Sequence, residues 1–319
     1  MSHKKDMKLV TKSDSGNKYK QPVNIDTPGY VDFKGIRMED HCEVYKNANS
    51  CFISVSDGHG SVAHNPTSYL GGKESSMNAC TFAVRYRNMN PFRLFERIQR
   101  ELYTVSEYLS SNNSNTEVKD GYFVVNKTSP RPHSVYSMHG CTLSCLSIRN
   151  GKLTCSWVGD SSIMRYNKHM DEASFLTTSN HDIHDENDLK RVIENGGRRY
   201  GKSYVKYRLP DGEDYMFQLT RSLGHFGNKA ISHIPEVIKS KVQLGDIFVV
   251  ATDGLWKYVN ISEVQQILRI SESLENACDK MIEKAIKKHP NNRDNVCIVI
   301  VEISSKKMNM MDYIKNIFN

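Results

Sequence analysis

The sequence predicts an α+β fold in which largely antiparallel sheets pack face to face and helices lie outside them. Three observations support this prediction. Apolar stretches of strand length surround two pairs of helical segments, at 67–109 and 261–288. Strands and helices do not alternate regularly, as they would in a parallel βαβ sheet. The dipeptide Asn150-Gly151 separates two strand-like segments, which is a strong signal for an antiparallel hairpin.

In the first half of the chain, a polar, lysine-rich stretch gives way to regular patterns at Pro28-Gly29. Period-two alternation and apolar runs predict strands, and apolar residues at helical spacing predict helices, the second of which opens at Pro91. The expected strands are 30–33, 41–45 and 51–56, and the expected helices are 67–88 and 91–109. Residues 110–138 are expected to form a polar loop followed by irregular structure.

In the second half, the run 247–251 is continuously apolar, which is typical of a strand buried on both faces. The pair Gly196-Gly197 ends the helix that precedes it. The expected strands are 140–148, 152–158, 163–166, 204–209, 215–219, 247–251 and 296–303, and the expected helices are 185–195, 261–268 and 274–288. We therefore divide the chain into a flexible basic N-terminal arm (1–27), a folded domain (28–303) and a short basic tail (304–319) with helical apolar spacing.

Composition argues against several classes of function. The chain has 43 basic and 36 acidic residues, a modest excess of +7, and it lacks zinc, helix-turn-helix and RNA-binding motifs, so no nucleic-acid partner is expected. It lacks an apolar run of about 18 residues and an apolar N-terminal stretch, so neither a membrane span nor secretion is expected. Eight cysteines without a CxxC pair predict buried thiols and a reducing intracellular compartment, cytoplasm or nucleus. A monomer is the default expectation.

Three aspartates, Asp57, Asp253 and Asp294, each adjoin an apolar strand and a small or polar residue. One Asp-Gly pair alone is a common turn, but three acids in this setting favour a shared site. Oxygen ligands without partnering His or Cys suit magnesium or manganese rather than zinc. Two such ions can hold a water between them, lower its pKa and polarise a phosphoryl oxygen, which suits the very slow hydrolysis of phosphate monoesters.

These acids belong to an ordered set of short motifs. The motifs are Met38-Glu39-Asp40, Asp57 to Gly60, Gly140-Cys141-Thr142, Gly159-Asp160-Ser161, His181 to Gly197, Leu219 to Gly224, Thr252 to Trp256 and Arg293-Asp294-Asn295. In this order they resemble the metal-dependent serine/threonine protein phosphatases of type 2C, the PPM family, from about Gly35 to Ile303. Any one motif is weak, whereas the ordered set is specific. The resemblance implies a central antiparallel β-sandwich flanked by pairs of antiparallel helices.

The resemblance also implies a set of metal ligands for two Mn²⁺ or Mg²⁺ ions. Asp57 would bridge the two ions, and the backbone carbonyl of Gly58 would bind one of them. Asp253 and Asp294 would bind the other ion. Glu39 would lie beside that ion or in its water shell, and Asp160 would help hold a weaker third ion.

For the substrate, the resemblance implies that His59 is the general acid that protonates the leaving serine or threonine oxygen, and that Arg37 binds phosphate. The family pattern has two residues between that arginine and the MED motif, whereas Arg37 directly precedes Met38. Because strand faces alternate with period two, this shift keeps Arg37 on the same face, displaced by about 7 Å.

Three further positions depart from the family pattern. Lys257 stands where an acid is common, His225 where aspartate is common, and Ser162 where arginine is usual. A lysine that points into a metal site repels cations and weakens their binding. These departures bear on rate and metal affinity, while the core ligands are present.

The sequence therefore predicts a hydrolase that removes phosphate from phosphoserine and phosphothreonine in a protein substrate, by a metal-bridging water with His59 as general acid. The alternative is a catalytically impaired binding module with the same fold, which Lys257, His225 and the shortened Arg37 segment favour. A cysteine-based phosphatase is not expected, because Ala48 stands where the arginine that follows His41-Cys42 would have to fall.

Overall fold

The computed structural model describes residues 5–14, 38–47, 50–60, 71–111, 116–119, 122–125, 133–135, 139–208, 212, 214–288 and 294–305. For 5–14, 109–111, 116–119, 122–125, 133–135 and 305 only the backbone is described. Arg37 and the predicted strand 30–33 lie outside the described residues. The same holds for residues 1–4 and 15–27 of the arm and residues 306–319 of the tail.

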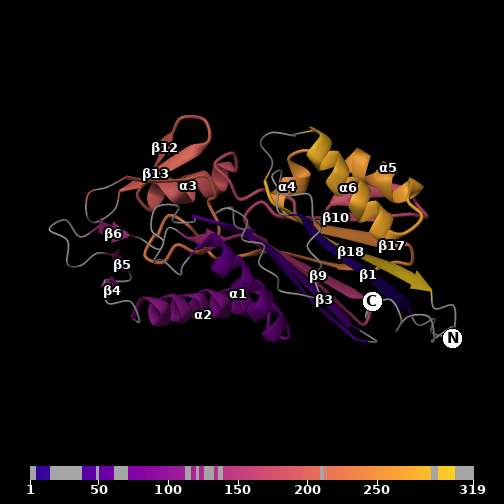
Figure 1. Ribbon diagram of the computed structural model, residues 1–319, viewed down its shortest axis with the longest axis horizontal. Helices are drawn as coiled ribbons and strands as arrows, with labels where there is room; N and C mark the ends of the chain where they lie inside the picture. Colours follow the sequence, from indigo (N-terminus) through magenta and orange to yellow (C-terminus); the bar gives the residue numbers. More distant parts are fainter. Residues whose placement is uncertain are drawn as a thin grey trace.

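Two antiparallel sheets form the centre of the molecule (Figure 1). The first has the order β1 (Lys5–Asp14), β18 (Val296–Ser305), β17 (Asp246–Ala251), β10 (Ser162–Asn167) and β11 (Glu172–Phe175). The second has the order β15 (Leu223–Gly224), β7 (Gly140–Cys141), β3 (Ser50–His59), β8 (Leu143–Arg149), β9 (Lys152–Val158) and β16 (Glu236–Lys241), with β2 (Asp40–Lys46) also paired to β3.

The two sheets pack face to face over one apolar core. Ile53 on β3 and Leu146 on β8 face Phe248 on β17 and Val299 on β18, and all four side chains are fully buried in one cluster. The predicted α+β fold with packed antiparallel sheets is therefore confirmed, because the alternation along each strand places one apolar set between the sheets.

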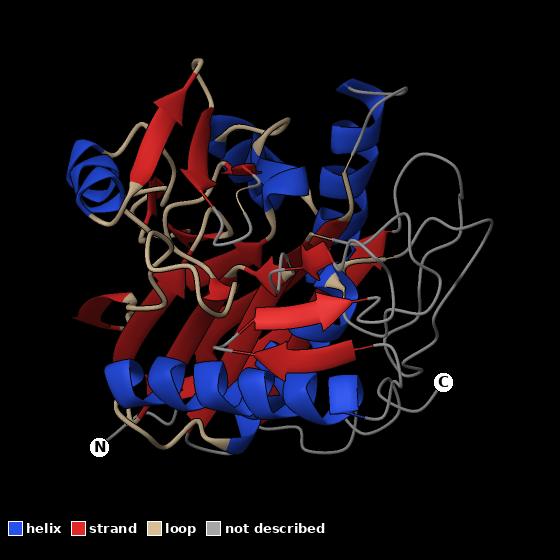
Figure 2. Cartoon of the chain, turned by 90° about the vertical axis from the view of Figure 1, so that its left-hand side faces the viewer, coloured by secondary structure: helices blue, strands red, loops and turns tan. Residues whose placement is uncertain are grey.

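The other set of apolar side chains faces the helices that cover the sheets. Helices α1 (Gly72–Arg85) and α2 (Pro91–Ser111) cover the seven-stranded sheet, where Phe95 packs with Leu143. Helices α4 (Asp253–Trp256), α5 (Ile261–Ile270) and α6 (Leu274–Lys288) cover the five-stranded sheet, where Met281 packs with Val249. Figure 2 shows helices on opposite sides of the stacked strands.

Two small sheets complete the described part of the chain. Strands β12 (Gly197–Tyr200), β13 (Tyr204–Arg208) and β14 (Asp214–Phe217) share a buried cluster with α3 (Glu186–Glu194). Strands β4 (Thr116–Lys119), β5 (Tyr122–Val125) and β6 (His133–Val135) form the other sheet, inside a region that was expected to be irregular. Their four or fewer residues each are too short to give a clear period-two pattern.

The N-terminal arm differs from the prediction. Lys5–Asp14 form β1, which pairs with β18 from Lys5 opposite Ser305 to Asp14 opposite Val296, so this part of the arm is a strand. Its lysines interrupt the apolar alternation by which a strand is recognised in a sequence, although charged residues are common on an edge strand. The division into arm, domain and tail otherwise stays a prediction.

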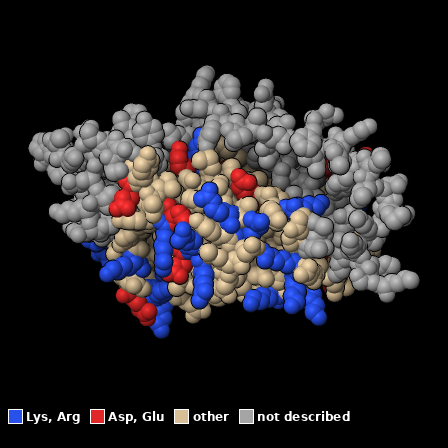
Figure 3. All heavy atoms as spheres, turned by 90° about the horizontal axis from the view of Figure 1, so that it is seen from below, with Lys and Arg blue, Asp and Glu red and all other residues tan. Residues whose placement is uncertain are grey.

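Three general expectations bear on the surface and the cysteines. All eight cysteines are buried free thiols, as predicted. Among the described residues, no helix has the length and apolar character needed to cross a membrane. On the face shown in Figure 3, Lys and Arg side chains are interspersed with acidic and neutral ones, and the expected lack of a nucleic-acid partner stays a prediction.

Candidate active site

Four aspartates lie where strands of the two main sheets begin or end. Asp57 is near the end of β3, and Asp160 follows β9 in the same sheet. Asp253 is the first residue of α4, two residues after β17, and Asp294 precedes β18 in the other sheet. The site is thus assembled from both sheets at one edge of the sandwich.

Three of these carboxylates form a tight group. Asp57, Asp160 and Asp253 each offer an oxygen within 4.8 Å of the others. Asp253 is 7% exposed, and its Oδ1 has no hydrogen-bond partner among the described residues. A buried acceptor without a donor, in a group of oxygen ligands alone, fits Mg²⁺ or Mn²⁺. The sequence prediction placed Asp57, Asp253 and Asp294 at one site and added Asp160 as a ligand of a weaker third ion. In the structure Asp160 belongs to the tight group, and Asp294 lines the same cavity.

The protonation of the group reflects the same burial. Burial raises the pKa of Asp57 well above its usual range, and the neighbouring carboxylates raise it further. Burial and Asp253 raise the pKa of Asp160 to about 7. Burial also raises the pKa of Asp253, although Lys257 opposes this. A cation bound among the three acids would favour their charged forms and so lower these raised pKa values.

Backbone contacts fix the position of Asp57. Its N–H donates to Thr142 Oγ1 at 2.9 Å, and its carbonyl accepts from the N–H of Thr142 at 2.8 Å. The Thr142 hydroxyl also lies 2.7 Å from Ser161 Oγ, next to Asp160. A Cβ on Gly58 would lie 2.0 Å from the carbonyl oxygen of Gly72, so only glycine lets β3 pass this close to the start of α1.

Glu39 and Asp40 lie beside this group. Glu39 lines the site cavity, and its N–H donates to Asn295 Oδ1 at 2.8 Å. Asp40 is buried opposite Asp57 in the β2–β3 register and accepts from Thr252 Oγ1 at 2.6 Å. Burial raises the pKa of Asp40 well above its usual range. The sequence prediction left Asp40 out, although it stands in the same MED motif as Glu39.

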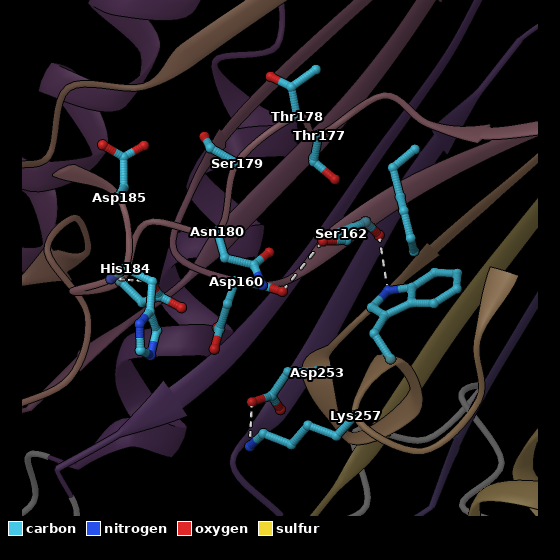
Figure 4. Close-up of a pocket in the computed structure, with 13 residues that line it drawn as sticks. Asp160, Ser162, Thr177, Thr178, Ser179, Asn180, His184, Asp185, Asp253 and Lys257 are labelled. Atoms are coloured by element: carbon cyan, nitrogen blue, oxygen red, sulfur yellow. Dashed lines mark hydrogen bonds and ion pairs between the residues drawn. The ribbon is translucent and has the colours of Figure 1, made fainter. Parts of the chain in front are cut away.

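Lys257 enters the site from the end of α4. Its Nζ contacts Asp253 Oδ2 (Figure 4). The same Nζ lies 3.2 Å from Asp294 Oδ2. Burial alone would lower the pKa of Lys257, but the carboxylates of Asp253 and Asp294 raise it above its usual value, so the amine is charged. The side chain of Lys257, which stands where the family commonly has an acid, thus points into the acid group.

His59 faces a second histidine. Its Nε2 lies 2.7 Å from Nε2 of His225 and 3.2 Å from Ser222 Oγ, and the two rings stack with centroids 4.9 Å apart. Burial lowers the pKa of His59 to about 4 and lowers that of His225 well below its usual value. At neutral pH both rings are therefore uncharged, and one donates to the other. Gly140 makes room for this pair, because a Cβ there would lie 2.4 Å from His225 Nε2.

Two open cavities meet at the acids. One, of about 500 Å³, is lined by Glu39, Asp57, Gly58, His59, Asp160, Asp253, Lys257 and Asp294, and extends to Tyr204, Tyr215 and Phe217 of the small sheet beside α3. The other, of about 700 Å³, shares Asp160, Asp253 and Lys257 and continues along the hydroxyl-bearing segment 177–179 (Figure 4). The structure thus brings the predicted site residues together around one opening, apart from Arg37, which lies outside the described residues.

Both the sequence and the fold are similar to those of known proteins. The chain matches the family model "Protein phosphatase 2C" over residues 45–296. It is 25% identical over 185 residues to "Probable protein phosphatase 2C 12" of Oryza sativa subsp. japonica, a match that covers 53% of this chain and 47% of that relative. The chain therefore spans about half the length of the curated relative that it matches.

Solved structures share the fold. Serine-threonine phosphatase 2C from Toxoplasma gondii superimposes with a TM-score of 0.68 at 16% identity, covering 95% of this chain and 96% of that one. A C. elegans sex determining protein gives 0.61 at 19% identity, covering 92% and 64%. The catalytic domain of the phosphatase PstP, in complex with two manganese ions, gives 0.52 at 15% identity, covering 94% and 99%.

Proposed function

Because the chain belongs to the protein phosphatase 2C family, we propose that it hydrolyses phosphoserine and phosphothreonine monoesters in proteins with the help of divalent metal ions. The observation that carries this proposal is the convergence of Asp57, Asp160 and Asp253 at the meeting point of two open cavities. A phosphorylated side chain on a protein surface can enter such an opening.

The acid group would hold Mn²⁺ or Mg²⁺. The ligands that the family resemblance assigns to two ions, and to a weaker third, are the carboxylates of Asp57, Asp160, Asp253 and Asp294, the carbonyl of Gly58, and Glu39 directly or through water. When bound, such ions lower the pKa of a coordinated water and polarise a phosphoryl oxygen. Burial of Asp57 and Asp253 keeps the ligands in place and strengthens their attraction for a cation.

We assign to His59 the proton that the leaving serine or threonine oxygen needs. The ring lines the cavity beside Asp57, which is the right place for this role. Its pKa of about 4 makes the charged ring scarce in the empty site. A phosphate dianion bound nearby would raise the pKa of His59, because an opposite charge favours the protonated form. Arg37 remains our candidate for phosphate binding.

Turnover of a phosphothreonine peptide by the purified protein with Mn²⁺ tests this function. We expect turnover by the wild type, none by Asp57→Asn, and wild-type turnover by Glu272→Gln, which neutralises an exposed acid away from the site. Equal rates for wild type and Asp57→Asn would overturn the proposal. We expect a monomer, which light scattering during gel filtration would check.

A specific observation favours the alternative, an impaired binding module. The Lys257 ammonium lies among the carboxylates, and His225 replaces the acid that is common beside the general acid. Calorimetric titration with Mn²⁺ separates the two functions. A protein that binds no ion and turns over no phosphopeptide would be the binding module.

A further inference from the structure

The Lys257 ammonium holds the position between two carboxylates that the family resemblance assigns to a metal. It contacts Oδ2 of Asp253 (Figure 4) and also lies 3.2 Å from Oδ2 of Asp294, which the figure does not draw. Both oxygens therefore already have a cationic partner, supplied by the chain itself.

The fold fixes this position. Lys257 follows Asp253 by four residues, and the backbone N–H of Lys257 donates to the carbonyl of Asp253 at 2.8 Å, which is one turn of helix. Residues four apart lie on the same helix face, so the lysine side chain meets the carboxylate. The neighbouring Trp256 anchors α4, because its indole N–H donates to the carbonyls of Ala251 at 3.0 Å and Ser162 at 3.3 Å.

The two oxygens of Asp253 consequently differ. Oδ2 pairs with Lys257, whereas Oδ1 is buried and has no hydrogen-bond partner in the described part of the chain. Asp57 and Asp160 place their carboxylates within 4.8 Å of Asp253 and of each other. One oxygen of Asp253 is thus available to a metal ion, and the other is neutralised.

We propose that Lys257 takes the place of one divalent ion, so that the chain binds a single Mn²⁺ or Mg²⁺ among Asp57, Asp160 and Asp253 and holds an ammonium between Asp253 and Asp294. This inference rests on the proposed metal dependence of the site. A divalent ion and the ammonium cannot both occupy the space between the same two oxygens. The ion must displace a charged group that is tethered one helical turn away, and its affinity falls accordingly.

Counting bound ions tests the proposal without substrate. Calorimetric titration with Mn²⁺, checked by metal analysis after gel filtration, should give one ion for the wild type. Lys257→Met keeps an unbranched side chain that is one atom shorter and removes its charge. It should bind a second ion at least about tenfold more tightly than the wild type does, because one unit of positive charge next to the ion is gone.

Three controls separate this effect from a general one. Lys190→Met removes an exposed lysine that pairs only weakly, at 4.0 Å, with Glu194 on α3, and should still give one ion. Lys257→Arg keeps the charge and should also give one. Lys257→Met combined with Asp294→Asn should lose the second ion again. Circular dichroism confirms that each variant is folded.

Two results would overturn the proposal: a wild type that binds two Mn²⁺ ions as tightly as Lys257→Met does, or a folded Lys257→Met that gains no ion. These outcomes differ from a failure of the proposed function. An inactive protein with one bound ion, and two in Lys257→Met, would refute the phosphatase activity and leave the role of Lys257 standing.

Discussion

The closest backbone approach in the site gives the sharpest prediction. Gly254 follows Asp253 in α4, and Asn295 follows Asp294 before β18. A Cβ on Gly254 would lie 1.8 Å from the carbonyl oxygen of Asn295. Hydrogen bonds between Thr252 and Cys297, at 3.1 and 3.0 Å, hold the same two segments together. Gly254→Ala must therefore push apart the segments that carry two of the acids.

The size of the effect follows from this distance. Ordinary van der Waals contacts of a Cβ begin at 3.4 Å, so the separation must open by about 1.6 Å. Overpacking of this kind typically costs about 1–3 kcal/mol. A protein of this size should lose about 2–4 °C in Tm for each kcal/mol. A displacement of about 1 Å near reacting groups can lower a rate about 100-fold, so we expect a loss of at least this size in kcat.

Gly201→Ala is the matched control. Gly201 has a φ of 63°, and an added Cβ there would meet nothing within 4 Å, so the same substitution costs only the strain of a left-handed residue, about 1 kcal/mol. Thermal unfolding without metal, calorimetric binding of Mn²⁺ and phosphopeptide turnover should be measured on both variants. The reasoning is wrong if Gly254→Ala matches Gly201→Ala in Tm and keeps wild-type Mn²⁺ affinity and turnover.

Two further predictions concern other parts of the site and its support. Asp188 is buried and accepts hydrogen bonds from Arg221 at 2.8 Å and from Thr220 at 2.8 Å, so Asp188→Ala should cost about 3 kcal/mol in urea unfolding, and a cost below about 1 kcal/mol would contradict this. Burial raises the pKa of Asp188, but the two donors lower it by more, so the pKa lies below its usual value. The contribution of Asp188 to stability is therefore present above about pH 4 and lost as pH falls through the lowered pKa. Asp188→Ala should lack this acid dependence. His59→Gln should lower kcat by about 10²–10⁴-fold and leave Mn²⁺ binding unchanged, and an unaltered kcat would remove the proton-donor role.

Much of the sandwich could be predicted from local patterns. The apolar runs 51–56, 247–251 and 296–303 are strands because each one fills a core from both sides, and Asn150-Gly151 does form the predicted hairpin turn between β8 and β9. The family resemblance is confirmed by the match over residues 45–296. Strand β1 could not be predicted, because its stabilising partner lies at the opposite end of the sequence.

The arrangement of the acids could be predicted only in part. Strand ends indicated that Asp57, Asp253 and Asp294 share a site, and the family resemblance added Asp160. Which of these acids lie closest together depends on the order of strands in each sheet. That order places Asp160 in the group. The sequence also identified Lys257 as a departure from the family pattern but did not show where its side chain points. The rotation of α4 about its axis directs that side chain toward Asp253. Asp40 was missed because the phase of β2, unknown from sequence alone, determines which acid of the MED motif is buried beside Asp57.

The participation of both sheets has a consequence for folding kinetics. Asp57 and Asp160 come from the seven-stranded sheet. Asp253 adjoins β17 of the five-stranded sheet, where β17 pairs with β18. Contacts between residues so far apart in the chain form slowly, because long loops must close before the contacts are made. A growing or truncated polypeptide that lacks Val296–Ser305 cannot complete the five-stranded sheet. Metal-binding competence should therefore arise late and all at once, as a reporter of completed folding rather than of any single segment.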